Sequence, residues 1–186
     1  MSMKLEKKGA RLRNSWVRFL GDRRGNALEF LALALPFSFL VFAILESCIS
    51  FAGQEVMANA TEDVARKLRT GQIRAADIDE VKLKQLICNE MAIIVANECP
   101  GLLVDLREFP SFAAAAAVKI KFTPAKDIDT TGFAVDPGPS MSRNMLRVFY
   151  KWPVMTDFMR TMMSSLPDGK TLLFASVTWQ NEPFDD

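Results

Sequence analysis

The sequence predicts an α+β fold, in which a single N-terminal transmembrane helix extends into a domain with a small antiparallel sheet and one or two further helices. Two observations predict this fold. An uncharged apolar run at 30–45 continues into apolar residues at helical spacing, and beyond Gly101 the spacing of apolar residues changes to two. The length of 186 residues accommodates one domain of about 100 to 150 residues and an anchor.

Composition narrows the function classes before any motif is considered. Apolar residues make up 49% of the chain and charged residues 24%, as in ordinary globular proteins. The chain has no histidine, which excludes Ser-His-Asp and Cys-His nucleophilic sites and two-histidine zinc motifs. Its three cysteines cannot supply a four-thiolate zinc site. These counts exclude much familiar catalytic and zinc chemistry. We expect that the chain is not an enzyme and that it has no metal and no cofactor.

Basic residues are concentrated in the leader at 1–25, which holds eight of them against two acidic residues, whereas the remainder holds 15 basic and 20 acidic residues. A basic arm followed directly by an apolar run is typical of a juxtamembrane segment. By the positive-inside rule the N-terminus is cytoplasmic and the chain after Gly53 is periplasmic or extracellular. The arm is also compatible with nucleic-acid binding, but the acidic body has no such motif, so we expect no nucleic-acid partner.

The predicted transmembrane helix covers 26–52. Its centre, FLALALPFSFLVFAIL at 30–45, has 16 residues and no charge. It extends about 24 Å, less than the ~30 Å hydrocarbon core, so flanking apolar residues must complete the span. The transmembrane residues singled out are Phe30, Leu35, Pro36 and Phe42, and Pro36 predicts a kink. A cleaved secretory signal is the alternative, although its apolar region is usually about 7 to 15 residues.

The helix is expected to continue as a periplasmic extension at 53–71. Apolar residues recur there at helical spacing with charged residues between them, and Gly71 provides a C-terminal stop. Glu46, near the outer end of the span, is expected to reach headgroups or water, with a second intramembrane carboxylate as the alternative. Cys48 is expected to be a small buried apolar residue, with intermolecular pairing as the alternative.

The junction between arm and span holds the most specific motif. From residue 23 it reads RRGNALEFLALALP, with Gly25, then Glu29 and Phe30 at the start of the apolar helix. This segment resembles the processing site of type IV prepilins and pseudopilins, and more narrowly the TadE-like family of tight-adherence (Flp) pilus assembly proteins. The VFYKWP run at 148–153 and the closing NEPF at 181–184 are also similar to family members. One difference is that Glu29 is the fourth residue after the glycine, where the family has the fifth.

The resemblance implies a minor pseudopilin-like subunit that helps initiate or prime pilus assembly. A prepilin peptidase would cut between Gly25 and Asn26, and Glu29 would pair with the free amine of a neighbouring subunit. The implied partners are other minor pseudopilins and pilin subunits, the peptidase, the inner-membrane assembly platform and the lipid bilayer. The implied location is the bacterial inner membrane, single-pass, with a periplasmic domain of pilin-like fold.

The residue types at this junction support these roles without the family. Glycine has no side chain to obstruct a protease that needs an extended chain. A carboxylate at membrane depth costs a few kcal/mol unless it has a partner. The alternatives are that Gly25 is only a linker residue and that Glu29 only interacts with the helix dipole at the interface.

Residues 72–186 form the predicted periplasmic domain. The segment at 77–80 is typical of a helix start, and Pro100 and Gly101 end that helix at the latest. The resemblance implies a disulfide between Cys88 and Cys99, which an oxidising periplasm favours. An unbroken helix through Asn97 would hold their Cα atoms about 16 Å apart, so either the helix ends near Met91 or there is no disulfide.

The remainder is predicted to contain four strands and one short helix. The period-two segments lie at 102–107, 118–122, 146–152 and 173–179, and the methionine-rich helical stretch lies at 154–165. Its methionines suit gap-filling in the core, with an adaptable binding face as the alternative. The alanine run at 113–117 is undecided between helix and strand, and 124–142 is expected to be a long exposed loop.

Two other functions compete with the pilus subunit. The first is a membrane-anchored periplasmic ligand-binding or scaffolding module whose helix is only a tether. The second is an enzyme that uses a pair among Asp127, Asp129 and Asp136, although carboxylates in so turn-rich a segment suit solvated turns.

Overall fold

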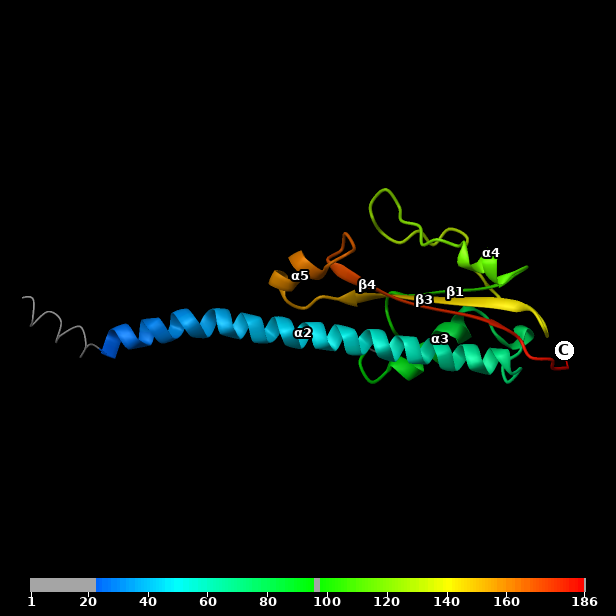
Figure 1. The fold of residues 1–186 in the computed structure, drawn as a ribbon, viewed down its shortest axis with the longest axis horizontal. Coiled ribbons are helices and arrows are strands. Elements are labelled where there is room, and N and C mark those ends of the chain that lie inside the picture. Colours follow the sequence, from blue (N-terminus) through cyan, green and yellow to red (C-terminus); the bar gives the residue numbers. More distant parts are fainter. Residues whose placement is uncertain (1–22, 96–97, 186) are drawn as a thin grey trace, which may run out of the picture. The chain divides into compact units, whose positions relative to one another are not determined.

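The computed structural model describes residues 23–95 and 98–185, with side chains from residue 27 onward, so most of the predicted basic leader lies outside the described residues. The chain divides into two compact units, of which the first ends at Leu45 and the second begins at Glu46. The elements, shown in Figure 1, are α2 (Arg23–Arg69), the 3-10 helix η1 (Ala75–Asp77), α3 (Glu80–Met91), β1 (Leu102–Phe109), α4 (Phe112–Ala116), β2 (Val135–Asp136), β3 (Arg143–Pro153), α5 (Asp157–Met163) and β4 (Lys170–Gln180). The fold is therefore α+β, with a long N-terminal apolar helix as predicted.

Helix α2 has 47 residues, and the boundary between the two units lies within it. Pro36 lies inside it and cannot donate a backbone hydrogen bond to the preceding turn. The helix ends where the sequence predicts. The amides of Gly71 and Gln72 donate to the carbonyls of Leu68 and Lys67, at 3.2 and 2.9 Å. Gly71 has φ +71°, the left-handed conformation that closes such a helix end at little steric cost for glycine.

The sheet has four strands in the order β2-β1-β3-β4. Strands β1, β3 and β4 are antiparallel neighbours, but β2 runs parallel to β1, so the sheet is mixed and not wholly antiparallel as predicted. The predicted strand at 118–122 is wrong. The segment instead folds back on the residues that follow it, because a turn between Thr123 and Asp127 brings Phe122 opposite Ile128 in an isolated bridge.

The core lies between one face of this sheet and two helices. The C-terminal half of α2 and the inner side of α3 contribute Met57, Ala60, Val64, Ala65, Leu68, Leu83, Ile87 and Met91. Alternate residues of β1, β3 and β4 face them, among them Val104, Leu106, Leu146, Val148, Tyr150, Trp152, Leu173 and Trp179. The period-two patterns at 146–152 and 173–179 therefore predicted these strands and this inner face correctly.

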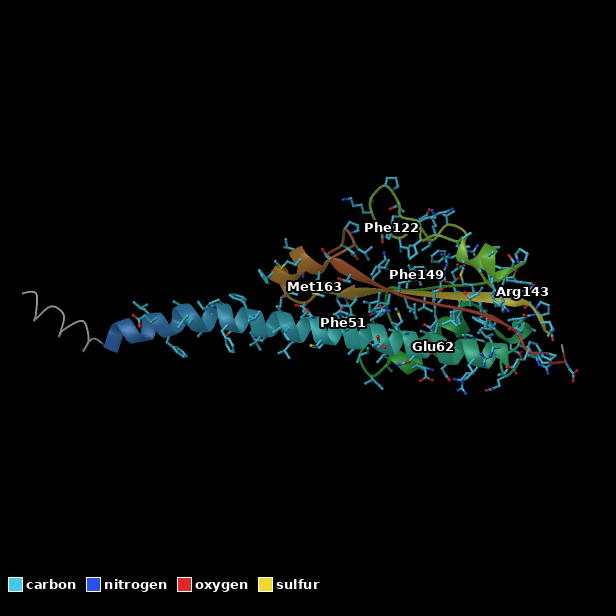
Figure 2. The ribbon with its side chains drawn as sticks, viewed as in Figure 1. Phe51, Glu62, Phe122, Arg143, Phe149 and Met163 are labelled. Atoms are coloured by element: carbon cyan, nitrogen blue, oxygen red, sulfur yellow. A yellow bond between two sulfur atoms is a disulfide. The ribbon has the colours of Figure 1, made fainter. Side chains whose placement is uncertain are left out.

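The opposite face of the sheet is also covered. The predicted exposed loop contains β2, the buried Ile128 and the half-buried Phe133. The Phe133 ring stacks on the ring of Phe149 on β3, at 5.4 Å between centroids. Figure 2 labels Phe149 on this side of the sheet. The expectation of a wholly exposed loop is wrong, because the apolar residues within it cover a second apolar face of β3.

A buried ion pair lies beneath this loop. Arg147 donates from Nη2 and Nε to Oδ2 of Asp105, at 2.6 and 2.9 Å, and both residues are buried. The guanidinium also lies over the rings of Phe133 and Phe149. The other oxygen of Asp105 accepts the amide of Ala134, which ties the loop to β1. One pair thus holds two strands and the covering loop together.

Helix α3 and the disulfide settle the alternative left open by the sequence. Asp79 caps the helix by accepting the amide of Lys82 at 2.7 Å. The helix ends at Met91, and Cys88 and Cys99 form a disulfide with Cα atoms 5.8 Å apart. The alanine run forms the short helix α4, which Ser111 caps.

Helix α2 packs tightly against the sheet at Gly53. A β-carbon at this position would lie 2.7 Å from Cζ3 of Trp152, closer than two carbon atoms can pack. Gly53 and Trp152 are both buried. The missing side chain therefore sets how closely the helix packs against β3.

Replacing Asp105 tests the buried pair. We expect Asp105→Ala to lower the free energy of unfolding by about 3 to 5 kcal/mol, because the Arg147 guanidinium stays buried without its carboxylate. Urea unfolding of the full chain in detergent micelles measures this loss. The matched control is Asp136→Ala, at an exposed position, where the expected change is within about 0.5 kcal/mol. Equal losses at both positions would contradict the assignment.

Filling the space at Gly53 tests the helix–sheet contact. Glycine to alanine within a helix ordinarily gains about 1 kcal/mol, but overpacking a tight contact costs about 1 to 3 kcal/mol. We expect Gly53→Ala to be destabilising by about 1 kcal/mol and to change the near-UV circular dichroism of tryptophan. In a Trp152→Phe background the same substitution should cost less, and an undiminished cost there would exclude the ring contact as its cause.

Candidate functional site

The predicted processing site lies in the first turn of α2. Gly25 and Asn26 are its third and fourth residues, in helical conformation. The first four amides of a helix have no acceptor within the helix, so this turn is the part of α2 that unwinds at least cost. Unwinding this one turn would therefore present the backbone around Gly25 and Asn26 to a peptidase in an extended conformation.

Glu29 follows on the next turn, and its side chain is exposed. Within the described part of the chain, no cation forms an ion pair with it. Phe30, Leu35 and Phe42, which were predicted to face lipid, are exposed by 72%, 52% and 59%. Glu29 therefore precedes a stretch of apolar side chains that are largely exposed.

That surface extends around the whole helix. The exposed large apolar residues between 28 and 45 are Leu28, Phe30, Leu31, Leu33, Leu35, Phe37, Phe39, Leu40, Val41, Phe42, Ile44 and Leu45. At 100° per residue they point in every direction, unlike the single stripe of a soluble core helix. By length and composition α2 qualifies as a helix able to cross a membrane, and its most apolar stretch is not buried.

At the start of the second unit, Glu46 connects α2 to α5. Its carboxylate is buried and accepts hydrogen bonds from the amide of Met155 and from the amide and hydroxyl of Thr156. The Thr156 hydroxyl in turn accepts the amide of Met159 as the cap of α5. One turn of α2 thus fixes the start of α5. The expectation that Glu46 reaches headgroups or water is wrong, because these donors satisfy it within the protein.

Its neighbours on α2 reinforce this connection. The Ser47 hydroxyl lies 3.8 Å from the sulfur of Met163, which Figure 2 labels on α5. Cys48 is a free, exposed cysteine, so the expectation of a buried one is wrong.

The outer edge of the sheet is partly closed by side chains. Gln54 on α2 donates to the carbonyl of Phe174 at 2.8 Å and accepts its amide at 3.3 Å, as a neighbouring strand would. The Ser165 hydroxyl accepts the amide of Leu172. Further along, Ser176 and Thr178 have the same parity as Phe174, so their backbone groups face the open edge of β4.

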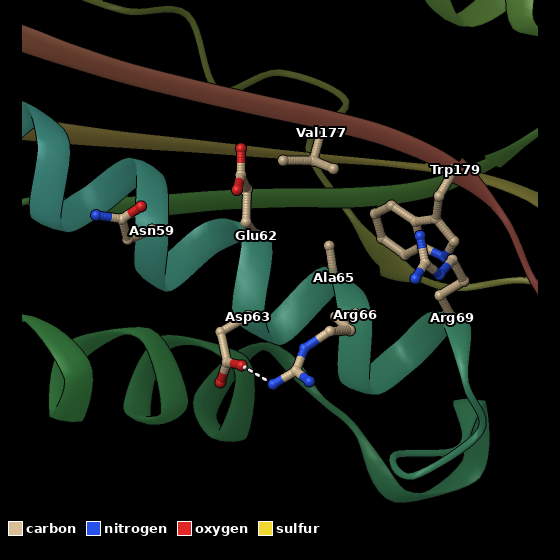
Figure 3. Close-up of a pocket in the computed structure, with 8 residues that line it drawn as sticks. All are labelled: Asn59, Glu62, Asp63, Ala65, Arg66, Arg69, Val177 and Trp179. Carbon is tan, nitrogen blue, oxygen red and sulfur yellow. Dashed lines mark hydrogen bonds and ion pairs between the residues drawn. The ribbon is translucent and has the colours of Figure 1, made fainter.

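A groove of about 440 Å³ lies between α2 and β4 (Figure 3). It is lined by Asn59, Glu62, Asp63, Ala65, Arg66, Arg69, Val177 and Trp179. Asp63 pairs with Arg66 and Lys67, each at 2.7 Å, and hydrogen bonds from these two cations lower its pKa. Figure 3 shows the Glu62 carboxylate directed toward Val177. The groove carries both signs of charge on the α2 side, and Val177 and Trp179 of β4 give it an apolar wall.

Two of the three carboxylates considered for an enzyme have structural roles, and the third, Asp136, is exposed on β2. Asp127 binds Lys151 at 2.7 Å, and this hydrogen bond lowers its pKa. Asp129 accepts the amide of Thr131, and hydrogen bonds from that residue lower its pKa. A carboxyl group with a lowered pKa is a poor general acid near neutral pH. Among the described residues no three His, Cys, Asp or Glu side chains are grouped as a metal site would need.

The closing NEPF segment has a structural role at the far end of the sheet. The Asn181 amide donates to the carbonyls of Gly138 and Pro139, and its oxygen accepts the indole N–H of Trp179. The next residue returns to α2, because the amide of Glu182 donates to the carbonyl of Arg69. Asn181 therefore joins the last strand, the covering loop and the end of α2.

Comparison with protein families, with curated proteins and with solved structures found no match. The function of the chain is accordingly inferred from its own residues.

Sequence reasoning missed the contacts of three of these residues. Glu46, Gln54 and Asn181 are polar residues whose partners are about 110, 120 and 40 positions away. Glu46 carried a physical signal, because a carboxylate next to an uncharged run requires a partner. Asn181 stood out only through the NEPF run of the resemblance, and Gln54 had no signal.

Replacing Glu46 by its amide tests the connection to α5. The amide has one acceptor oxygen and turns an N–H₂ group toward donors, so Glu46→Gln should release the start of α5. We expect amide hydrogen exchange at Met155 and Thr156 to rise about tenfold. The matched control is Glu55→Gln, at an exposed position on the same helix, and equal acceleration there would contradict the role of Glu46.

Proposed function

We propose that this chain is a minor pseudopilin-like, TadE-like subunit of a tight-adherence pilus system. In this proposal it spans the inner membrane once, is processed by a prepilin peptidase and helps initiate or prime the fibre. The observation that carries the proposal is the opening of α2, where one exposed carboxylate, Glu29, precedes an apolar surface that surrounds the helix. Such a surface is stable in lipid, and such a carboxylate needs a partner there.

The orientation follows from charge and from cysteine chemistry. The eight basic residues before the span favour a cytoplasmic N-terminus. The second unit would then lie in the periplasm, where disulfides form, and the disulfide between Cys88 and Cys99 is consistent with that compartment.

The role of Glu29 in assembly is electrostatic. Cleavage after Gly25 would leave Asn26 with a free, positively charged amine at the cytoplasmic end of the span. In a low-dielectric surrounding, that amine on one subunit and the carboxylate on its neighbour attract strongly at hydrogen-bonding distance. The pair would align adjacent helices without any catalysis by this chain.

Mass spectrometry of the membrane-extracted protein tests the processing step. In cells that carry the peptidase we expect the chain to lack residues 1–25, and Gly25→Val to retain them because a branched side chain obstructs the scissile position. An intact N-terminal arm in the unmodified protein would refute processing at this site.

Assembly tests the ion pair. We expect Glu29→Ala to abolish incorporation into the pilus complex, measured by co-purification with partner subunits. Its effect on the free energy of unfolding should stay within about 0.5 kcal/mol, because the side chain is exposed. Glu55→Ala, on the same helix outside the uncharged run, is the control and should assemble normally.

A second candidate is a membrane-anchored scaffolding or ligand-binding module. The groove between α2 and β4 favours it, because that groove lies beside the open part of the β4 edge. Exchange of residues 26–45 for an unrelated transmembrane helix distinguishes the two functions. A tether tolerates this exchange, whereas a pseudopilin-like subunit loses assembly.

A further inference from the structure

Three exposed apolar side chains form a stripe, two on the outer side of α5 and one on the residue before its cap. Phe158 and Met162 are four positions apart on α5, which places them on one side of the helix, and Met155 directly precedes the cap residue Thr156. Their exposed fractions are 72%, 54% and 72%. Met159, one position from Phe158, faces the interior with 7% exposed. The predicted gap-filling role therefore holds for Met159 but not for the two exposed methionines.

We propose that this stripe rests in the interfacial layer of the lipid bilayer beside the point where α2 leaves it. The inference depends on the proposed membrane span and adds a second contact with the membrane. The kind of partner is a lipid surface, with the headgroup and acyl-chain boundary as the layer that the side chains enter.

The position of α5 along α2 carries the argument. Glu46 and Ser47 contact Met155, Thr156 and Met163, so α5 lies beside the turn of α2 that directly follows the uncharged run. If residues 27–45 occupy the hydrocarbon core, over about 28 Å at ~1.5 Å per residue, this turn lies at its surface. Amphipathic elements at such a level bury their apolar side by about 5 to 10 Å.

Other exposed apolar side chains of the second unit lie near the same turn of α2. Ile49 and Phe51 on α2, a few residues beyond Glu46, are 46% and 72% exposed. Elsewhere in the second unit, the large exposed apolar residues are spread over separate segments: Val81, Ile93, Phe112, Phe122 and Met141. The stripe therefore belongs to a local cluster of exposed apolar side chains, unlike the single exposed apolar residues that are common on protein surfaces.

The charges around α5 are compatible with this placement. Asp157 pairs with Arg160 at 2.9 Å, and Asp168 pairs with Lys170 at 3.0 Å. Their side chains are exposed by between 41% and 93%, so each pair stays hydrated at headgroup level. An interfacial layer accepts such paired charges, whereas the hydrocarbon core does not.

The small size of the stripe favours lipid over a protein partner. A stable protein interface buries about 1,200 Å² or more, which three side chains on a seven-residue helix do not supply. Contact with the membrane needs far less, because the covalent link through α2 already holds α5 at the surface and raises its effective concentration there.

Site-specific labels on the full chain test the proposal. Single cysteines are introduced by Met162→Cys, Val81→Cys and Phe37→Cys in a Cys48→Ser background, with the disulfide retained. Each carries an environment-sensitive fluorophore, and the protein is reconstituted into phosphatidylcholine and phosphatidylglycerol vesicles that contain a lipid-borne quencher. Val81 is the matched control, since it is 74% exposed on α3.

We expect quenching at 162 to exceed that at 81 about threefold, with an emission shift to the blue. Strong quenching at 37 with equal, weak quenching at 162 and 81 would overturn the proposal and leave the span intact. Weak quenching at all three positions would refute the span itself. Protection of 162 only after addition of a partner protein, without lipid quenching, would also overturn the proposal.

A triple variant gives a second measurement. Met155→Ser, Phe158→Ser and Met162→Ser replace side chains that are mostly exposed, so far-UV circular dichroism should be unchanged. In vesicles, amide hydrogen exchange in α5 of the variant should be about tenfold faster than in α5 of the unmodified chain. Helix α3 is the internal control, and its amide exchange should be the same in the two reconstituted proteins. Equal exchange of α5 in the two reconstituted proteins would overturn the proposal.

Discussion

The packing of α2 against the inner face of the sheet is the constraint on which the rest of the structure depends. The described side chains of α2 are mostly exposed before Glu46, and from Glu46 onward the helix buries one side. From there to its end, α2 contacts the rest of the second unit at regular intervals. Glu46 binds the start of α5, Gly53 meets Trp152, Gln54 binds the edge of β4, and Arg69 binds the C-terminal segment.

The period of the apolar residues predicted the parts of the fold that depend on burial alone. Alternation at 146–152 and 173–179 gave two long strands, because each has one face on the helices. Helical spacing from Val56 to Leu68 and the stop at Gly71 gave the second half of α2. These elements have strong local signals that the tertiary structure does not overrule.

The errors come from segments whose partners are distant in sequence. Residues 118–122 alternate as a strand should, yet no neighbouring strand is available to them, and they turn back on themselves. The segment at 124–142 is polar by composition but contains Ile128 and Phe133, which cover the second face of β3. The alternation of apolar residues along β3 does not reveal that both of its faces are buried, because a loop, and not a helix or strand, covers the second face.

The candidate site divides in the same way. The motif from Gly25 to Phe30 is contiguous, so it can be read from the sequence, although the role proposed for it depends on partners outside this chain. The contacts of Glu46, Gln54 and Asn181 are made within the chain across long separations, and only the fold brings them together.

The open part of the β4 edge limits how copies of this chain can associate. Helix α2 runs in the same direction as β4, since Gln54 lies beside Phe174 and Arg69 beside Glu182. If two copies joined their sheets by antiparallel pairing of β4, their helices would point in opposite directions. If the chain spans the membrane once, as proposed, copies rooted in one bilayer cannot adopt that arrangement. The Gln54 amide also shortens the edge left for any other strand.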